Sequence, residues 1–294
     1  MVADEEAGKF FHGGAPQTSR SRGCRAVFIF TLLLPFICSG AEPRKPQSPT
    51  TPPPALKQRL NVKLPGRNIL TLVRIPKGKF SMSVTDDKGN VADKELELVF
   101  KQDFYLSSTE ITQEQYQAVM KENPACFKGK KMPVERVSWH DAMRFCRRLN
   151  ELNLAPPDWC FTLPTEAQWE YAAAEGINHW DAENGDKTEA PPPGWYKKNS
   201  GGKPHPVGTQ RPNKLGLYDM CGNVCEWCLD DYIRDGRKIR AEYRRGEDSR
   251  TTYRVFRGGS WGVSEELCQP EKRFGAPPLM RSNFIGFRVA LVRM

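Results

Sequence analysis

The amino-acid sequence predicts a loop-rich α+β domain. Three segments carry helix-start signals, and several short segments rich in Val, Ile and Leu indicate strands. Long connections without periodicity separate these elements, and the chain contains seven Trp residues. At 294 residues the chain is long enough for one large domain or two small ones. Few regular elements among many loops are typical of a mixed α+β fold.

The strand signals lie near both ends of the domain. Residues 69–75 are rich in Ile, Leu and Val and predict a first strand, with which residues 79–83 are expected to pair. Residues 96–106 carry the next strand or strands, and residues 85–90 between them have turn chemistry. The last strands are expected at 253–257 and 285–293.

Three helices are predicted from the capping residues at their starts. In each case a Ser or Thr precedes a Gln or Asp by three residues, so that the two residues can satisfy backbone N–H groups reciprocally. The second helix presents one apolar face, on which Cys146 is expected to be part of the core rather than a reactive thiol. The three pairs are Thr112 with Gln115, Ser138 with Asp141, and Thr165 with Gln168.

Two long connections lack any periodicity, at residues 176–202 and 232–252. A loop of such length inside a compact domain is usually functional or held in place by a ligand. The first of the two is therefore expected to be functional or to be held by a ligand.

The N-terminus has the order of a secretory signal peptide. Basic residues precede an apolar run at 26–38, and small residues at 39–41 suit cleavage. The run is shorter than the about 20 residues that a membrane helix needs, so an uncleaved anchor is the second interpretation. We therefore expect a signal peptide at 1–41, a secreted or periplasmic (extracytoplasmic) protein, and no stable membrane span after cleavage.

A Pro-rich linker is expected at 42–67, before a folded domain at 68–294. Prolines and polar residues dominate the linker, which cannot bury enough apolar surface to fold. Residues 1–67 also hold 10 of the 44 Lys and Arg but 4 of the 35 Asp and Glu, which leaves 34 basic and 31 acidic residues in the domain. Most of the net charge of +9 lies outside the domain, and we expect no nucleic-acid partner.

The stretch Gly216–Trp227 contains the densest group of candidate ligands. It reads Gly-Leu-Tyr-Asp-Met-Cys-Gly-Asn-Val-Cys-Glu-Trp. Its glycines allow tight backbone turns, and the carboxylates of Asp219 and Glu226 add the hard oxygens that calcium prefers. The alternative is a tight turn between two buried aromatic anchors.

This stretch belongs to a series of motifs that occur in one order along the chain. In that order the sequence resembles the formylglycine-generating enzyme family, also called the sulfatase-modifying factors, from about Leu70 to Val292. The six motifs that carry the resemblance are Phe104-Tyr-Leu, Glu110-Ile-Thr-Gln, Pro133-Val-Glu-Arg-Val-Ser-Trp, Leu163-Pro-Thr-Glu-Ala-Gln-Trp-Glu-Tyr-Ala, Arg257-Gly-Gly-Ser-Trp and Ile285-Gly-Phe-Arg.

The resemblance implies a C-type-lectin-like architecture, in which two or three helices lie against a small, irregular antiparallel sheet. It also implies a structural calcium site. The family builds this site where the chain has Asp219, the carbonyls of Gly222 and Val224, and Glu226. Asn199 is a candidate for a second calcium position, with a solvated turn as the alternative.

The resemblance further implies an oxidase that uses copper(I), held by two cysteines, to convert a sulfatase cysteine to formylglycine. Cys268 occupies the second cysteine position, but Val263 occupies the first. Ser260 matches the serine of the family's oxygen pocket and is also part of the general fold signature. Because valine cannot ligate copper(I), a soft ion that suits thiolates, the sequence leaves the oxidase reaction in doubt.

Seven cysteines lie outside the expected signal peptide, and an odd number leaves at least one unpaired. Cys221, Cys225 and Cys228 have the Cys-x3-Cys-x2-Cys spacing of some iron–sulfur clusters, which we interpret as a coincidence. A local disulfide, a soft-metal site and independent substitutions all remain open for these three residues. The fold could also bring their loop close to the Gly258–Trp261 segment and thereby to Cys268.

Three functions are therefore compared. The first is an active formylglycine-generating oxidase that acts on a sulfatase polypeptide. The second is a non-catalytic binding module that keeps the calcium-ordered fold, and the third is an accessory protein that holds another extracytoplasmic protein or a glycan. Val263 favours the second and third functions, and the intact surrounding motifs favour the first.

Overall fold

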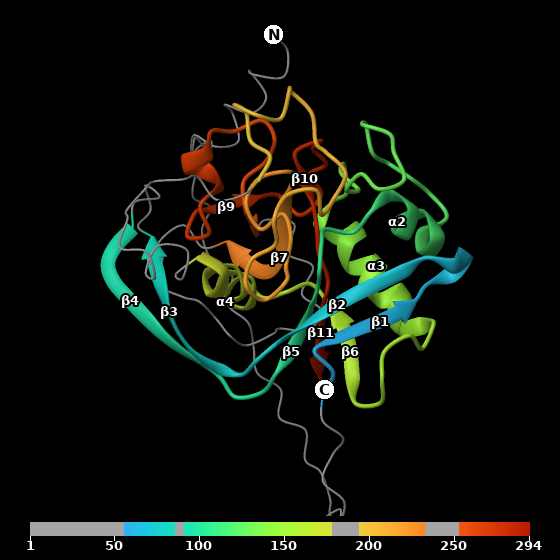
Figure 1. Ribbon diagram of the computed structural model, residues 1–294, viewed down its shortest axis with the longest axis horizontal. Helices are drawn as coiled ribbons and strands as arrows, with labels where there is room; N and C mark the ends of the chain where they lie inside the picture. The colour runs from blue at the N-terminus through green and yellow to red at the C-terminus, as the bar shows by residue number, and fades with distance from the viewer. Residues whose placement is uncertain (1–55, 86–90, 178–193, 233–252) are drawn as a thin grey trace, which may run out of the picture. The chain divides into compact units, whose positions relative to one another are not determined.

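The computed structural model describes residues 56–85, 91–177, 194–232 and 253–294. From Lys57 onward these residues belong to one compact unit. The expected signal peptide, most of the expected linker, the turn after Thr85 and much of both long connections lie outside the described residues. Within them the α+β class is confirmed, with three α-helices and three β-sheets (Figure 1).

The first sheet has five strands in the order β1–β2–β5–β11–β6, and all neighbours in it are antiparallel. The C-terminal strand β11 lies between β5 and β6, so segments from the start, middle and end of the domain share one sheet (Figure 1). The predicted strand at 69–75 is confirmed. The five strands are β1 (Arg59–Lys63), β2 (Ile69–Ile75), β5 (Phe104–Ser107), β6 (Trp159–Thr162) and β11 (Ala290–Arg293).

The folded domain begins before the expected boundary at residue 68. Strand β1 pairs with β2 along its whole length, and a 3-10 turn at Pro65–Arg67 joins the two strands. Val62 and Leu64 are buried, whereas Arg59, Asn61 and Lys63 of the same strand are polar and exposed. Because one side of this edge strand is polar, the sequence of the segment resembles that of a linker. Residues 59–67 belong to the folded domain.

A separate hairpin consists of β3 (Gly78–Thr85) and β4 (Val91–Phe100). The expectation that residues 79–83 pair with the first strand is therefore wrong. Both edges of β2 are already occupied, by β1 on one side and β5 on the other. Strand β2 also ends directly before Pro76, which cannot continue a ladder because it has no backbone N–H.

A third sheet has four strands in the order β10–β7–β8–β9. The pair β10–β7 is parallel and the other pairs are antiparallel. The prediction of a strand at 253–257 is confirmed, whereas β6, β7 and β9 were not expected from the sequence. The strands of this sheet are β7 (Cys225–Tyr232), β8 (Tyr253–Arg257), β9 (Arg273–Ala276) and β10 (Ile285–Gly286).

All three predicted helices are present, as α2 (Gln113–Met120), α3 (Trp139–Glu151) and α4 (Glu166–Ile177). Reciprocal capping-box hydrogen bonds start α2 and α3 as expected, and Thr165 and Gln168 exchange the same pair of bonds before α4. Helix α3 packs beside α2 and β6, and α4 packs beside β3, β7 and β8. None of the described helices is long and apolar enough to cross a membrane.

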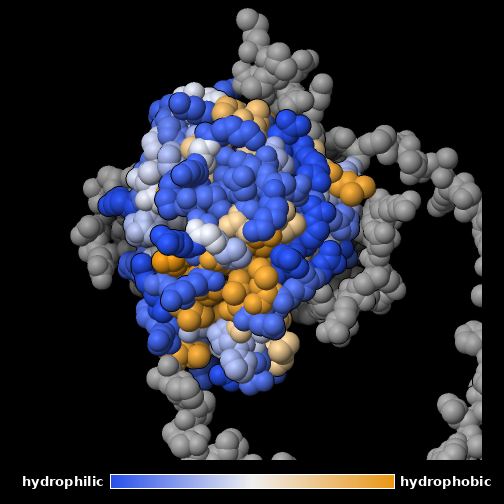
Figure 2. Space-filling view, turned by 90° about the vertical axis from the view of Figure 1, so that its right-hand side faces the viewer, coloured by the Kyte–Doolittle hydropathy of each residue, from blue (hydrophilic) through white to orange (hydrophobic). Residues whose placement is uncertain are grey.

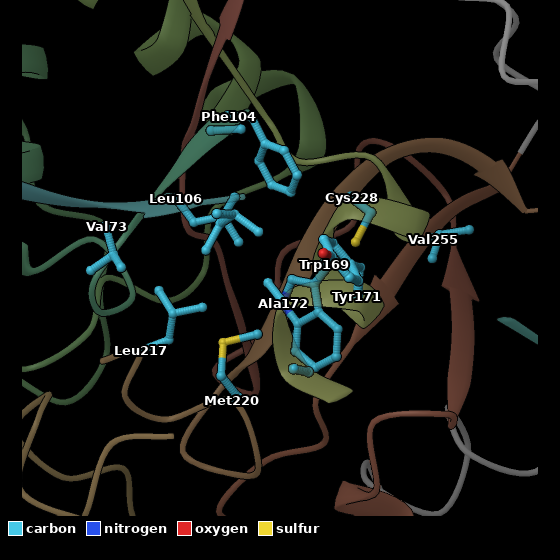
Figure 3. Packing of buried hydrophobic residues seen from close by; sticks show 13 residues of the cluster. Val73, Phe104, Leu106, Trp169, Tyr171, Ala172, Leu217, Met220, Cys228 and Val255 are labelled. Carbon is cyan, nitrogen blue, oxygen red and sulfur yellow. The ribbon is translucent and has the colours of Figure 1, made fainter. Parts of the chain in front are cut away.

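A buried hydrophobic cluster surrounds helix α4, where the helix packs beside β3, β7 and β8 (Figure 3). Trp169 and Tyr171 of α4 contribute its largest side chains, and Cys228 of β7 is also part of it. Cys146 on α3 is 1 % exposed, so the expectation that it belongs to the core is confirmed. Other members come from β2, β5, β8 and the loop before β7: Val73, Phe104, Leu106, Leu217, Met220 and Val255.

Candidate functional site

Two loops that are far apart in the sequence lie against each other before β7 and after β8. The backbone N–H of Gly222 donates to the carbonyl of Gly258 at 2.7 Å, and the N–H of Trp261 donates to the carbonyl of Asn223 at 2.8 Å. Gly222 has a φ of +83°, and a Cβ there would lie 2.3 Å from the carbonyl oxygen of Trp195. This position therefore requires glycine, and the two motifs form one continuous site.

A buried ion pair lies at the base of this site. The guanidinium of Arg288 donates to both carboxylate oxygens of Glu226, at 2.6 and 2.7 Å. The indole N–H of Trp169 donates to one of the same oxygens at 2.6 Å, and Glu226 and Arg288 are 0 % exposed. Arg288 also donates to the carbonyls of Ser107 and Tyr218. The protein's own donors thus engage both oxygens of Glu226.

Two further carboxyl groups lie beside this pair. Asp219 Oδ2 accepts a hydrogen bond from the N–H of Gly208 at 2.7 Å, whereas Asp219 Oδ1 is buried without a donor among the described residues. Glu110 is 0 % exposed and accepts weak bonds of 3.3 Å from Asn223 Nδ2 and the N–H of Val224. The sequence motif Glu110-Ile-Thr-Gln thus contributes directly to the site.

The charges of this carboxyl cluster do not balance. Burial raises the pKa of Glu110 well above its usual range, and the negative charges of Asp219 and Glu226 raise it further. Burial also raises the pKa of Asp219. Three carboxyl groups therefore face one guanidinium, that of Arg288. A protonated Glu110 can donate to Asp219, or a cation can neutralise the excess negative charge.

Two side chains of this cluster offer oxygens to a hard cation, but no group of three or more His, Cys, Asp or Glu among the described residues is placed to hold a metal ion. The unsatisfied Oδ1 of Asp219 and the uncompensated carboxyl of Glu110 are the oxygen ligands that calcium prefers. Glu226 differs from the expectation in that Arg288 already neutralises its charge. Among the other expected ligands, Val224 is buried in the same loop and Gly222 is fixed by its contact with Trp195.

Asn199 is not brought to this cluster by any hydrogen bond of its side chain among the described residues. Its Oδ1 accepts from the N–H of Tyr196 at 2.8 Å, and its Nδ2 donates to the carbonyl of Gly194 at 2.9 Å. The side chain therefore closes its own turn. Asn199 is also exposed to solvent, so its contacts are those of a solvated turn, and a second calcium position at Asn199 stays a prediction.

The second half of the site consists of Ser260, Val263 and Cys268, all of which are buried. Cys268 lies in a 3-10 turn (Glu265–Cys268), and its Sγ lies 3.9 Å from the carbonyl oxygen of Ser260. Val263 packs in a small cluster with Tyr196 and Cys268. The position that the resemblance assigns to the first of the two cysteines is therefore filled by the apolar side chain of Val263.

The three cysteines of the Cys-x3-Cys-x2-Cys motif do not converge. Cys228 belongs to the hydrophobic cluster around α4, which also contains Trp169 (Figure 3). Cys221 belongs instead to the small cluster that contains Cys268. Within the described ranges, no three His, Cys, Asp or Glu side chains are placed so that they could hold a metal ion. The interpretation of the iron–sulfur spacing as a coincidence stays a prediction.

Sequence reasoning missed two residues of the site, Glu110 and Arg288. Both lie inside quoted motifs, and Arg288 stands between the apolar residues Phe287 and Val289, whose burial was the stronger signal. A charged residue between two buried apolar neighbours is itself a sign, because buried charges are almost always paired. The partner cannot be read from the sequence, since Glu110 and Arg288 lie far from Asp219 and Glu226 along the chain.

The fold and this site define an α+β, C-type-lectin-like domain whose loops form a buried carboxyl cluster next to a group of buried thiols. The chain belongs to the sulfatase-modifying factor family, because the sulfatase-modifying factor enzyme 1-like domain matches residues 57–293. The match begins close to β1, in agreement with the earlier start of the folded domain.

Individual relatives carry different descriptions. The chain is 33% identical over 251 residues to the chaperone protein LppX of Paenibacillus barcinonensis, covering 68% of this chain and 83% of that protein. It is 32% identical over 175 residues to the formylglycine-generating enzyme of Streptomyces coelicolor, covering 54% of this chain and 52% of that enzyme. It thus spans about half of the enzyme's length.

A mouse relative is described as inactive C-alpha-formylglycine-generating enzyme 2. It is 30% identical over 183 residues, which cover 54% of this chain and 49% of that protein. Among solved structures, Treponema denticola variable protein 1 superposes with a TM-score of 0.64 at 28% identity, covering 80% of this chain and 99% of that one. The family thus includes both an enzyme and a protein named inactive.

Proposed function

We propose that this chain is an exported, calcium-ordered member of its family that does not carry out the oxidase reaction and acts as a binding or accessory protein. The observation that carries the proposal is Val263, which is 5 % exposed and packs with Tyr196 and Cys268. Two thiolates are needed to share copper(I) in the family's reaction, and the methyl groups of valine offer no ligand.

The partner that we propose is a sulfatase polypeptide, another extracytoplasmic protein or a glycan. One supporting observation is a patch of hydrophobic side chains on an otherwise largely hydrophilic face (Figure 2). Such patches are typical of interaction surfaces. The relatives named as a chaperone and as an inactive enzyme agree with a role in which the fold is kept without its chemistry. Export is supported by the basic and apolar order of the first 41 residues.

Calcium is proposed as the cation that orders the loop before β7. Asp219 and Glu110 would hold it through their carboxylates, because a bound cation would offset the cost of burying these two charges, a cost that raises the pKa of both groups. Calcium there would supply positive charge and order, with no part in catalysis.

The alternative function is an active formylglycine-generating oxidase that converts a sulfatase cysteine to formylglycine. One observation favours it: the small buried cluster contains a second cysteine, Cys221, in addition to Cys268. Ser260 also stands at its family position. The burial of these groups argues against it, because Cys221 and Cys268 are only 3 % and 0 % exposed and a substrate thiol must reach the metal.

The deciding experiment is a mass-spectrometric assay for the aldehyde on a sulfatase peptide, with copper(I) and oxygen supplied. We expect little or no product from the wild-type chain. Val263→Cys is the matched variant, since it restores the family's pair without changing Cys268. Clear turnover by the wild-type chain that disappears in Cys268→Ala would overturn the proposal in favour of the oxidase.

A further inference from the structure

Two loops beside the candidate site carry a concentration of positive charge. They are residues 123–134, between α2 and α3, and residues 194–218, before β7. These basic loops hold eight Lys and Arg and no Asp or Glu, whereas the other residues of 68–294 hold 26 Lys and Arg against 31 Asp and Glu. All eight basic residues are exposed to solvent: Lys128, Lys130, Lys131, Lys197, Lys198, Lys203, Arg211 and Lys214. The loops thus carry +8, while the remainder of 68–294 is net negative.

The two basic loops are hydrogen-bonded to each other. The backbone N–H of Val207 donates to the carbonyl of Lys131 at 2.9 Å. Within the second loop, the indole N–H of Trp195 donates to Thr209 Oγ1 at 3.0 Å, and the Trp195 ring stacks on His205 with 3.8 Å between the ring centroids. Figure 1 shows both loops at the upper end of the view, beside α2 and β10. Their charges therefore belong to one surface.

Buried contacts fix the backbone of the basic loops from below. The N–H of His205 donates to Asn223 Oδ1 at 2.9 Å, and the hydroxyl of Ser200 donates to the carbonyl of Trp261 at 2.8 Å. In the first loop, the ring of Phe127 meets Trp261 edge-on, with 5.4 Å between the ring centroids. The folded domain thus holds the charged side chains in place on a fixed backbone, which lowers the entropy cost of binding a ligand.

Two acidic side chains near the basic loops offset part of their charge. Glu114 pairs with Lys131 at 2.6 Å. Glu266 lies near Lys198, since a hydrogen bond from the side chain of Ser264 lowers the pKa of Glu266 and the charge of Lys198 contributes to that shift. Exposed ion pairs of this kind are weak, so an anionic ligand can compete for both lysines.

We propose that the basic loops bind an extended polyanionic glycan, whose sugar units carry sulfate or carboxylate groups. This inference names one partner class from the proposed function and rests on the export and the binding role proposed there. Seven of the eight basic residues are lysines, which are compact point charges without the fixed fork of arginine. Several such charges suit a ligand with repeated anionic groups better than a single carboxylate held at two points.

Trp195 favours a glycan over an acidic peptide. Its indole is partly exposed and lies next to Lys197 and Lys198 in the chain. An aromatic ring with a polar edge offers both apolar surface and a polar group at a wet interface, and the C–H face of a sugar ring can pack on such a surface. The same loop therefore presents charge for the anionic groups and apolar area for the rings that carry them.

The test uses heparin, a sulfated glycan, as the probe. Labelled heparin is titrated with the full chain at about 0.15 M NaCl, and binding is measured by fluorescence anisotropy. Two double variants, Lys128→Gln with Lys130→Gln and Lys198→Gln with Lys203→Gln, should each weaken binding about tenfold, and higher salt should weaken binding by the wild-type chain. The matched control is Lys57→Gln with Lys63→Gln, which removes two exposed lysines at β1 and should change the affinity less than about twofold.

Three results would overturn the proposal. The first is no binding of heparin, and the second is an equal loss of affinity in the control variant and in the loop variants. The third is binding of poly-L-glutamate as tight as that of heparin, which would assign the surface to an acidic peptide. The aldehyde assay is scored separately: turnover there would overturn the non-oxidase role and leave a heparin result standing, whereas failure of heparin binding would leave the non-oxidase role standing.

Discussion

Replacing Arg288 with methionine should destabilise the domain more than any change at a surface ion pair. The guanidinium makes four hydrogen bonds, two to Glu226 and one each to the carbonyls of Ser107 and Tyr218, and it is fully buried. Removing one partner of a buried ion pair costs about 3–5 kcal/mol, because the other charge remains uncompensated. Here Glu226 would remain next to two further carboxyl groups, those of Glu110 and Asp219.

The size of the effect can be measured by thermal unfolding. About 1 kcal/mol shifts the melting temperature of a domain of this size by roughly 2–4 °C, so the loss corresponds to roughly 6–20 °C. Arg148→Met is the matched control. Arg148 pairs with Glu151 on the surface of α3, where both side chains are more than half exposed, and such a pair contributes about 0–1 kcal/mol.

A double variant tests the reasoning itself. In Glu226→Gln with Arg288→Met, neither charge remains, while the glutamine oxygen can still accept from Trp169. Since a buried pair can be replaced by neutral residues at little cost, the double variant should melt above Arg288→Met alone. The reasoning is refuted if Arg288→Met melts within about 2 °C of Arg148→Met, or if the double variant is less stable than Arg288→Met.

Two further predictions concern calcium and pH. A chelator should lower the melting temperature of the wild-type chain, because calcium at 100 times its Kd adds about 2.7 kcal/mol to the free energy of unfolding. Asp219→Asn should abolish the difference between the samples with and without chelator. Equal melting temperatures of the wild-type chain with and without chelator would contradict the calcium proposal. Burial raises the pKa of Asp230 to about 7, and the charge of Glu166 contributes. The folded state therefore binds more protons than the unfolded state between about pH 4 and 7, so stability should fall as pH rises through this window. Asp230→Asn should flatten the slope measured by denaturant unfolding, and an unchanged slope would contradict the assignment.

Local signals predicted the helices and the outer limits of several strands. Capping pairs such as Ser138 with Asp141 work within three residues, so the helix starts could be read without knowing the fold. Strand pairing could not be read in this way. The partner of β2 was misassigned because β1 and β5 occupy its two edges, and β5 comes to β2 from about 30 residues further along the chain, which no local pattern shows.

The sequence predicted which positions belong to the site, such as Asp219 and Glu226, but it did not predict which residues contact them. Asp219 and Glu226 were expected to share one ligand, yet Glu226 is bound by Arg288 from 62 residues further along the chain. Strand β7 also begins inside the loop that looked like a turn. Its strand character depends on pairing with β8 and β10, which no local pattern within Gly216–Trp227 encodes.

The two halves of the site are held by different contacts, so a change in the thiol half leaves the contacts of the carboxyl half in place. In the carboxyl half, Glu226 of β7 accepts hydrogen bonds from Arg288 and from Trp169 of α4, and these buried contacts connect the helix with the strands. Among the described residues, Val263 forms no hydrogen bond with Arg288, Glu226 or Trp169. It packs with Tyr196 and Cys268. An apolar side chain suits that cluster, because a buried thiol behaves as a small hydrophobe. A cysteine-to-valine exchange at this position therefore changes the chemistry of the thiol cluster while leaving the ion pair that organises the fold untouched.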